Sequence, residues 1–109
     1  MLASEKFEMF LENSKDDTIL CRYSYLLGEK DVLSFAVIYF TVFGGKRFEV
    51  IRYDGQRDEK VNVHKFYSGS EEKVYLNNEL SFESVFGFVK DIEKNWHRYK
   101  ILFIQNNYI

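Results

Sequence analysis

Five short segments rich in β-branched and aromatic residues constrain the fold of this chain more than any other feature. Short stretches that hold glycine or acidic residues, the usual content of tight turns, separate them. Such a pattern predicts consecutive hairpins, and an antiparallel β-meander of about five strands is the simplest topology. In chain order the segments read TILCRYSYLL, VLSFAVIYFTVF, RFEVIRYD, KVNVHKFY and KVYL.

After Ser81 the spacing of the apolar residues changes to that of a helix. Large apolar side chains recur at intervals of three and four residues, which places them on one stripe of a helix of about 20 residues. Ser81 is a suitable N-cap, whereas Gly87 is a weak position inside the helix. We expect this stripe to pack on one face of the sheet. Its members are Val85, Val89, Ile92, Trp96, Tyr99 and Phe103.

A short N-terminal helix is predicted over residues 4–13. Ser4 can cap it, and Phe7, Phe10 and Leu11 fall at helical spacing. Ten residues are marginal as an isolated helix, so this segment must dock on the sheet. The expected fold is therefore α+β, with about five antiparallel strands, a short N-terminal helix and a long C-terminal helix.

Composition limits the function classes. A chain of 109 residues that is 46% hydrophobic and 29% charged fits one globular domain over residues 1–109. The net charge of −2 argues against a general polyanion binder, although Arg57, Lys60 and Lys65 make residues 46–65 locally basic. We expect no signal peptide, and the sequence holds no apolar run long enough to cross a membrane. Cys21 is the single cysteine, so we expect a cytoplasmic location and a structural, buried thiol.

The register of the central hairpin decides which residues share a face. If Gly44 and Gly45 form a two-residue turn, Val37 lies opposite Arg52 and Phe35 lies opposite Asp54. The long helix then covers the face that holds Ser34, Ala36, Ile38 and Phe40 with Ile51, Tyr53, Val61 and Val63. The opposite face combines Arg52, Asp54, Asn62 and His64 with aromatic rings, and four of these rings are candidate partner-binding residues: Phe35, Tyr39, Phe48 and Phe66.

Three of the polar residues on this face form a candidate catalytic set. His64 could transfer a proton, Asp54 could orient its ring, and Arg52 could stabilise negative charge, which suffices for metal-free RNA cleavage. A structural ion pair between Arg52 and Asp54 is the plainer interpretation. The sequence contains no phosphate-binding glycine loop and no metal-ligand spacing, so neither a cofactor nor a metal is expected.

The same aromatic face admits three further interpretations. It could be an interface between two copies of the chain, because large exposed apolar patches mark partner surfaces. It could stack the bases of single-stranded nucleic acid while nearby Arg and Lys residues contact phosphates. A ligand pocket beneath the sheet is the third.

Three segments carry a resemblance to known proteins: RYD at residues 52–54, the His of VNVHKFY at residues 61–67, and DIEKNWHRYK at residues 91–100. Together they resemble a group of small uncharacterised prokaryotic proteins and, more distantly, the TumE family of toxin-antitoxin systems. The TumE pattern has a cluster of His residues where this chain has His64, with Asn62 nearby. The resemblance implies an accessory protein with a protein partner such as an antitoxin, and RNA as a target.

The leading functional expectation is a non-enzymatic interaction module that binds itself or a protein partner through the aromatic sheet face. The alternative is a toxin-like protein that binds or cleaves RNA with Arg52, Asp54 and His64. Whether the chain is an enzyme is left open by the sequence.

Overall fold

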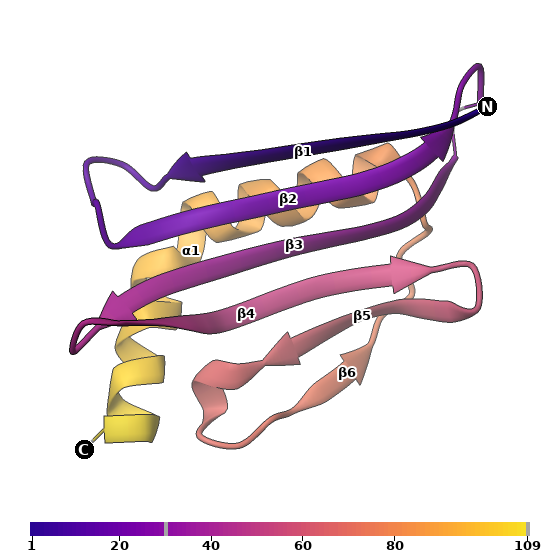
Figure 1. Cartoon of the computed structure of the whole chain (residues 1–109). Helices are drawn as coiled ribbons and strands as arrows, with labels where there is room; N and C mark the ends of the chain where they lie inside the picture. The colour runs from indigo at the N-terminus through magenta and orange to yellow at the C-terminus, as the bar shows by residue number, and fades with distance from the viewer. Residues whose placement is uncertain (30, 109) are drawn as a thin grey trace.

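A computed structural model describes residues 1–29 and 31–108 of the chain. One six-stranded antiparallel sheet runs in the order β1-β2-β3-β4-β5-β6, and one long helix lies across it (Figure 1). The strands are β1 (Leu2–Phe10), β2 (Asp17–Leu26), β3 (Val32–Phe43), β4 (Lys46–Gln56), β5 (Glu59–Lys65) and β6 (Lys73–Tyr75). The helices are the single 3-10 turn η1 (Phe66–Ser68) and α1 (Phe82–Tyr108). The predicted α+β class and the meander order are both confirmed.

The prediction of a short N-terminal helix is wrong, and this segment supplies the sixth strand. Residues 2–10 pair with β2 along their whole length, and Phe7 and Met9 alternate with exposed neighbours as they pack against the core. Phe10, which the helical reading placed on the packed stripe, is instead 63% exposed. Pairing with a neighbouring strand overrides the propensity of a ten-residue helix, which is marginal alone.

The long C-terminal helix agrees closely with its predicted stripe. All six stripe residues, Val85, Val89, Ile92, Trp96, Tyr99 and Phe103, are buried. Ser81 accepts a hydrogen bond of 3.2 Å from the backbone N–H of Ser84, so it caps the helix as expected. The helix is longer than predicted, because residues 105–108 continue it. Asn106 and Asn107 stabilise this last turn by donating to backbone carbonyls of η1.

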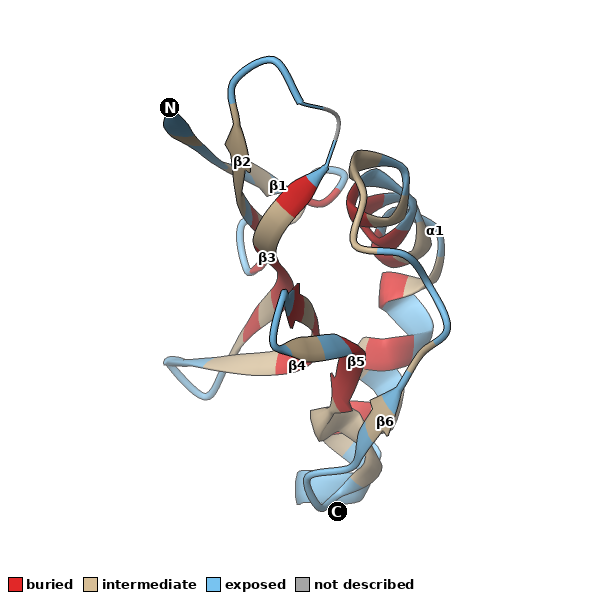
Figure 2. Cartoon of the chain, turned by 90° about the vertical axis from the view of Figure 1, so that its right-hand side faces the viewer, coloured by how far each residue is buried: buried red, intermediate tan, exposed pale blue. Residues whose placement is uncertain are grey.

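We call the side of the sheet that packs against α1 the helix side and the other the open side. Figure 2 shows the buried segments concentrated where the sheet faces α1. The sheet curls on its open side, since Arg47 of β4 reaches Glu8 of β1, with Nη2 3.0 Å from Oε1. Ala36 and Ile38 point to the open side yet are buried within this curve. The open side is therefore a concave surface floored by small and apolar residues.

A β-bulge in the central hairpin changes the predicted register. The Gly44-Gly45 turn forms as expected, with positive φ at both glycines, and Thr41 pairs with Phe48. Between Tyr39 and Phe40 the pairing then shifts by one residue, so that Val37 lies opposite Tyr53 and Ile38 opposite Arg52. The shift turns both Val50 and Ile51 into the core. Without the bulge, Arg52 would share a face with Val37; with the bulge it shares a face with Ile38. The β4 residues beyond the bulge are thus exchanged between the two faces relative to β3.

Candidate functional site

Arg52, Asp54 and His64 lie together on the open side of the sheet. Arg52 of β4 lies directly opposite His64 of β5, and Asp54 is two residues further along β4 on the same face. Oδ2 of Asp54 is 3.3 Å from Nε of Arg52 and 3.5 Å from Nε2 of His64. Arg52 also contacts Glu49 at 3.2 Å. The placement of the three candidate catalytic residues on one surface away from α1 is thus the arrangement that the sequence predicted.

The His64 ring is fixed by contacts with neighbouring side chains. Its Nδ1 lies 2.9 Å from Oε1 of Glu71, a residue in the loop before β6. Its ring stacks on Phe66 with 5.9 Å between the ring centres, and its side chain is 10% exposed. Sequence reasoning missed Glu71 because only the pairing of β5 with β6 brings its loop back to His64.

Asn62, the fourth polar residue of the predicted face, is fully buried. Its Nδ2 donates to the carbonyl of Lys60 at 3.0 Å. Its Oδ1 has no hydrogen-bond partner among the described residues. Asn62 therefore belongs to the interior of the β4–β5 hairpin and is not exposed on the surface.

Three of the four rings expected beside these polar groups lie on the helix side instead. Phe35 and Tyr39 are 5% and 0% exposed, and they contact Phe88 and Trp96 of α1. Phe48 packs against Phe103. Only Phe66 lies near the polar cluster, through its contacts with His64 and Arg52. The expectation that α1 covers Ser34, Ala36, Ile38 and Phe40 is wrong for the same reason: the bulge exchanges the faces of β4 relative to β3.

Two of the three segments that carry the resemblance meet on the helix side, through Tyr53 and Asp91. Oδ2 of Asp91 accepts hydrogen bonds of 2.7 Å from the hydroxyls of both Tyr53 and Tyr99, and its Oδ1 accepts one of 2.9 Å from Asn95. Burial and the Asp91 carboxylate raise the pKa of Tyr99 to about 12, and the same two causes raise the pKa of Tyr53. Both phenols are therefore neutral donors, which is the state that a structural hydrogen bond requires.

A second buried polar cluster surrounds Asp17 at the start of β2. The Asp17 carboxylate accepts hydrogen bonds from Ser14, Tyr39, Thr41 and Lys100, at 2.5 to 3.0 Å. Burial opposes ionisation of this group, but the four donors outweigh it and lower the pKa of Asp17. Lys100 comes from α1, so the cluster fixes the second half of the helix to the sheet.

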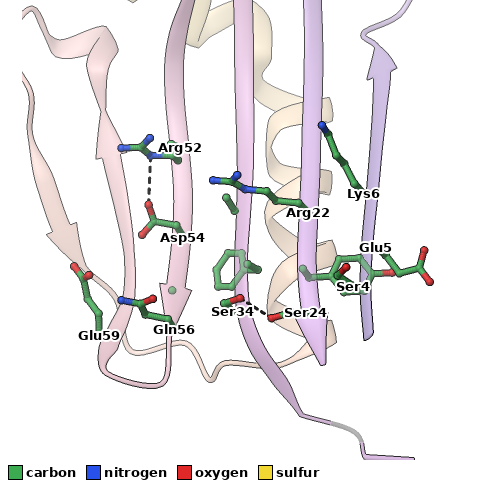
Figure 3. Close-up of a pocket in the computed structure, with 14 residues that line it drawn as sticks. Ser4, Glu5, Lys6, Arg22, Ser24, Ser34, Arg52, Asp54, Gln56 and Glu59 are labelled. Carbon is green, nitrogen blue, oxygen red and sulfur yellow. Dashed lines mark hydrogen bonds and ion pairs between the residues drawn. The ribbon is translucent and has the colours of Figure 1, made fainter. Parts of the chain in front are cut away.

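The curved open side contains a groove with a volume of about 630 Å³. Its lining residues come from β1, β2, β3, β4 and β5. Figure 3 shows Lys6 and Arg22 on one side of the groove and Arg52, Asp54 and Glu59 on the other. Between them the floor holds Ala36 and a pair of serines, Ser24 and Ser34, whose hydroxyls are 2.6 Å apart. The volume lies in the range of small-molecule sites.

The thiol lies outside this groove, and the described residues form no metal-binding cluster. Cys21 is buried on the helix side, and burial raises the pKa of its thiol to about 11, so the thiol is protonated at neutral pH. Within residues 1–29 and 31–108, no three His, Cys, Asp or Glu side chains converge as a metal site would require. The described part of the chain also contains no helix that is long and apolar enough to span a membrane.

These features define a small α+β domain: a curved antiparallel meander with one face covered by a helix and the other hollowed into a polar groove. Residues 3–109 match the model of DUF7718, a domain of unknown function, and the chain belongs to this family. No curated protein and no solved structure matches the chain.

Proposed function

We propose that this domain is a non-enzymatic interaction module and that its partner is a second copy of the same chain, paired through the β1 edge. The observation that supports the proposal is the free edge itself. β1 is nine residues long, pairs with β2 on one side only and contains no proline. An edge strand of this length presents a row of unpaired backbone N–H and C=O groups, which another strand can complete.

The charges of β1 favour one way for two copies to pair, because among axes within β1 only one at Phe7 sets opposite charges against each other. In an antiparallel pair, directly opposite residues lie on the same face of the sheet. When the two strands are identical, this requires the two-fold axis to pass at a residue of β1 and not between two residues. An axis at Glu5 or Lys6 sets that residue against its own copy, and like charges directly opposite are destabilising. An axis at Phe7 sets Lys6 of each copy opposite Glu8 of the other and packs the two half-buried Phe7 rings together. The sequence of β1 is thus self-complementary about Phe7.

Charge reversal tests this register. Lys6→Glu places two glutamates opposite each other at both ends of the symmetric contact, and Glu8→Lys places two lysines there. Each variant should weaken the dimer about tenfold or more, whereas Lys6→Glu combined with Glu8→Lys restores opposite charges and should recover much of the affinity. Sedimentation equilibrium or light scattering over a concentration series gives the dissociation constants.

Lys90→Glu is the matched control, because Lys90 is exposed on α1 and the substitution changes the net charge equally. A wild-type chain that stays monomeric at high micromolar concentration contradicts the proposal. So does a Lys6→Glu variant that dimerises as tightly as the wild type. Glu8→Lys also removes the contact between Glu8 and Arg47 within one chain. Thermal unfolding of this variant measures how far that loss destabilises the fold itself.

The convergence of Arg52, Asp54 and His64 favours a second candidate function, a toxin-like protein that binds or cleaves RNA. In this proposal His64 moves a proton, Asp54 orients the imidazole and Arg52 stabilises the developing charge. The distant resemblance to the TumE family points the same way and adds an antitoxin-like protein as partner. The Glu71 contact and the burial of His64 weigh against it, since a general base must reach its substrate.

Growth inhibition on expression tests this second function. Toxicity that His64→Ala relieves, while circular dichroism shows an unchanged fold, supports RNA chemistry at the cluster. His97→Ala is the matched control, because His97 is an exposed histidine on α1. Equal growth of cells that express the wild type and His64→Ala contradicts the proposal.

A further inference from the structure

Two cations lie directly opposite each other on the open side of the sheet. Lys6 of β1 and Arg22 of β2 are register partners, and their side chains project to the same face. Directly opposite positions in an antiparallel pair are about 5 Å apart at Cβ, so two like charges there repel. Neither side chain forms an ion pair with any residue that the structure describes.

Most of the other charges that line the groove are compensated. Asp54 lies against Arg52 and His64, and Glu59 forms an ion pair with Lys73. Glu5 also lines the groove without an ion pair to a described residue, but strand alternation directs it to the opposite face of β1 from Lys6. Lys6 and Arg22 are therefore the uncompensated cations of the groove. An anion bound beside them would remove the repulsion and gain charge-assisted hydrogen bonds from the guanidinium group.

The floor beside these cations is shaped to accept the rest of a ligand. Ala36 continues the row of Lys6 and Arg22 across β3, and its methyl side chain leaves space above the sheet. The neighbouring row contains Ser24, Ser34 and Gln56, all uncharged hydrogen-bonding side chains. Each serine hydroxyl has both a donor and acceptor capacity, so their mutual bond leaves capacity for a ligand.

We propose that the groove binds a small anionic molecule, with its carboxylate or phosphate group at Arg22 and Lys6 and a hydroxylated body over Ser24, Ser34 and Gln56. Arg22 is the principal ligand because it lies on an inner strand, and its side chain extends from β2 across β3 into the groove (Figure 3). The groove volume of about 630 Å³ fits a molecule of this size and not a folded partner. Arg22 does not lie on the pairing edge, so this inference stands on Arg22 whether or not the β1 dimer forms; in the dimer Lys6 would also face Glu8 of the second copy.

Calorimetric titration of the full chain tests the proposal with three probes: glycerol phosphate, gluconate and uncharged glycerol. We expect at least one of the two anions to bind and glycerol not to bind, and the tighter anion identifies the head group. Arg22→Gln should weaken binding about tenfold or more, which is the loss expected for one charge-assisted contact. Lys90→Gln removes an exposed cation of α1 and should leave binding unchanged.

A steric variant tests the shape of the groove independently of its charge. Ala36→Leu fills the floor without altering any ionisable group, and it should abolish binding while circular dichroism reports a folded chain. Binding that survives both Arg22→Gln and Ala36→Leu overturns the proposal, as does the failure of both anions to bind at millimolar concentration. A short single-stranded oligouridylate that binds in an Arg22-dependent way more tightly than either anion also overturns it, in favour of RNA.

Discussion

The hydroxyl of Tyr53 donates a hydrogen bond of 2.7 Å to Asp91 and so ties the middle of the sheet to the middle of α1. Tyr53 is the central residue of the RYD segment, and its two neighbours point to the other face of the sheet. Strand alternation therefore divides one short motif into a packing residue on the helix side and two charged residues on the open side.

Loss of the Tyr53 hydroxyl should destabilise the domain without changing its shape. Tyr53→Phe removes one of the donors that satisfy the Asp91 carboxylate, and we expect the free energy of unfolding to fall by about 1 to 3 kcal/mol. Urea denaturation followed by circular dichroism measures it. Tyr108→Phe is the control, since Tyr108 is exposed and its hydroxyl forms no hydrogen bond with the described residues. An equal change in both variants contradicts a structural role for the Tyr53–Asp91 bond.

The same cluster makes the domain sensitive to alkali. The pKa of Tyr99 rises from 10.0 to about 12 on folding, so the neutral phenol is the form that the fold stabilises. Its contribution is complete below pH 10 and is lost as the pH rises toward 12, because the unfolded chain ionises first. Unfolding curves recorded at successive alkaline pH values should show this decline, and Tyr99→Phe should reduce its slope. A slope that does not change in Tyr99→Phe contradicts the assignment.

The sequence was sufficient to predict the helix, the strands β2 to β6 and the polar side of the β4–β5 hairpin. These predictions rest on local signals: a stripe at helical spacing, glycine-containing turns, and alternation within one strand. Arg52 and Asp54 share a face because they are two residues apart in one strand, and His64 shares it because it lies directly opposite Arg52 in the β4–β5 pairing. Local periodicity thus predicted the geometry of the candidate catalytic set without any information on packing.

The remaining elements depended on interactions that local patterns do not record. The bulge at Val50 arises because both Val50 and Ile51 are buried in the core, and a ladder without an extra residue could bury only one of them. Phe35 and Tyr39 consequently pack under α1. β1 forms a strand because β2 offers an unpaired edge, a condition that exists only in the folded sheet. The uncompensated pair of Lys6 and Arg22 follows from that pairing, which a helix over residues 4–13 would not produce.

Gly55 marks a close approach that a side chain would disturb. A Cβ atom at this position would lie 3.0 Å from the Phe35 ring and 3.3 Å from the backbone of Val61. Gly55→Ala should therefore destabilise the domain by about 1 to 3 kcal/mol, because backbone cannot yield as a flexible side chain can. Thermal unfolding gives the change. An unaltered melting temperature would show that Phe35 and the β4–β5 hairpin adjust freely.

Gly87 gives the opposite expectation. It lies inside α1 with a negative φ and an exposed surface, and an added Cβ would contact nothing within 4 Å. Alanine lowers the conformational entropy of the unfolded chain and favours the helix, so Gly87→Ala should stabilise the domain by about 1 kcal/mol. The measured free energy should rise in urea denaturation with an unchanged m-value. A fall in stability contradicts the placement of Gly87 on the solvent side of α1.

Asp17 should account for part of the acid sensitivity of the domain. Its pKa is lowered from 3.8 on folding, so its contribution is complete above that pH and is lost as the pH falls through the lower folded value. Asp17→Asn leaves Lys100 without its carboxylate, and we expect a loss of about 3 kcal/mol at neutral pH, as for a broken buried ion pair. The variant should also unfold with less dependence on pH below 4. Asp16→Asn, at the exposed neighbouring position, serves as the matched control and should behave as the wild type. If the two variants lose stability equally, the buried Asp17 cluster does not fasten α1 to the sheet.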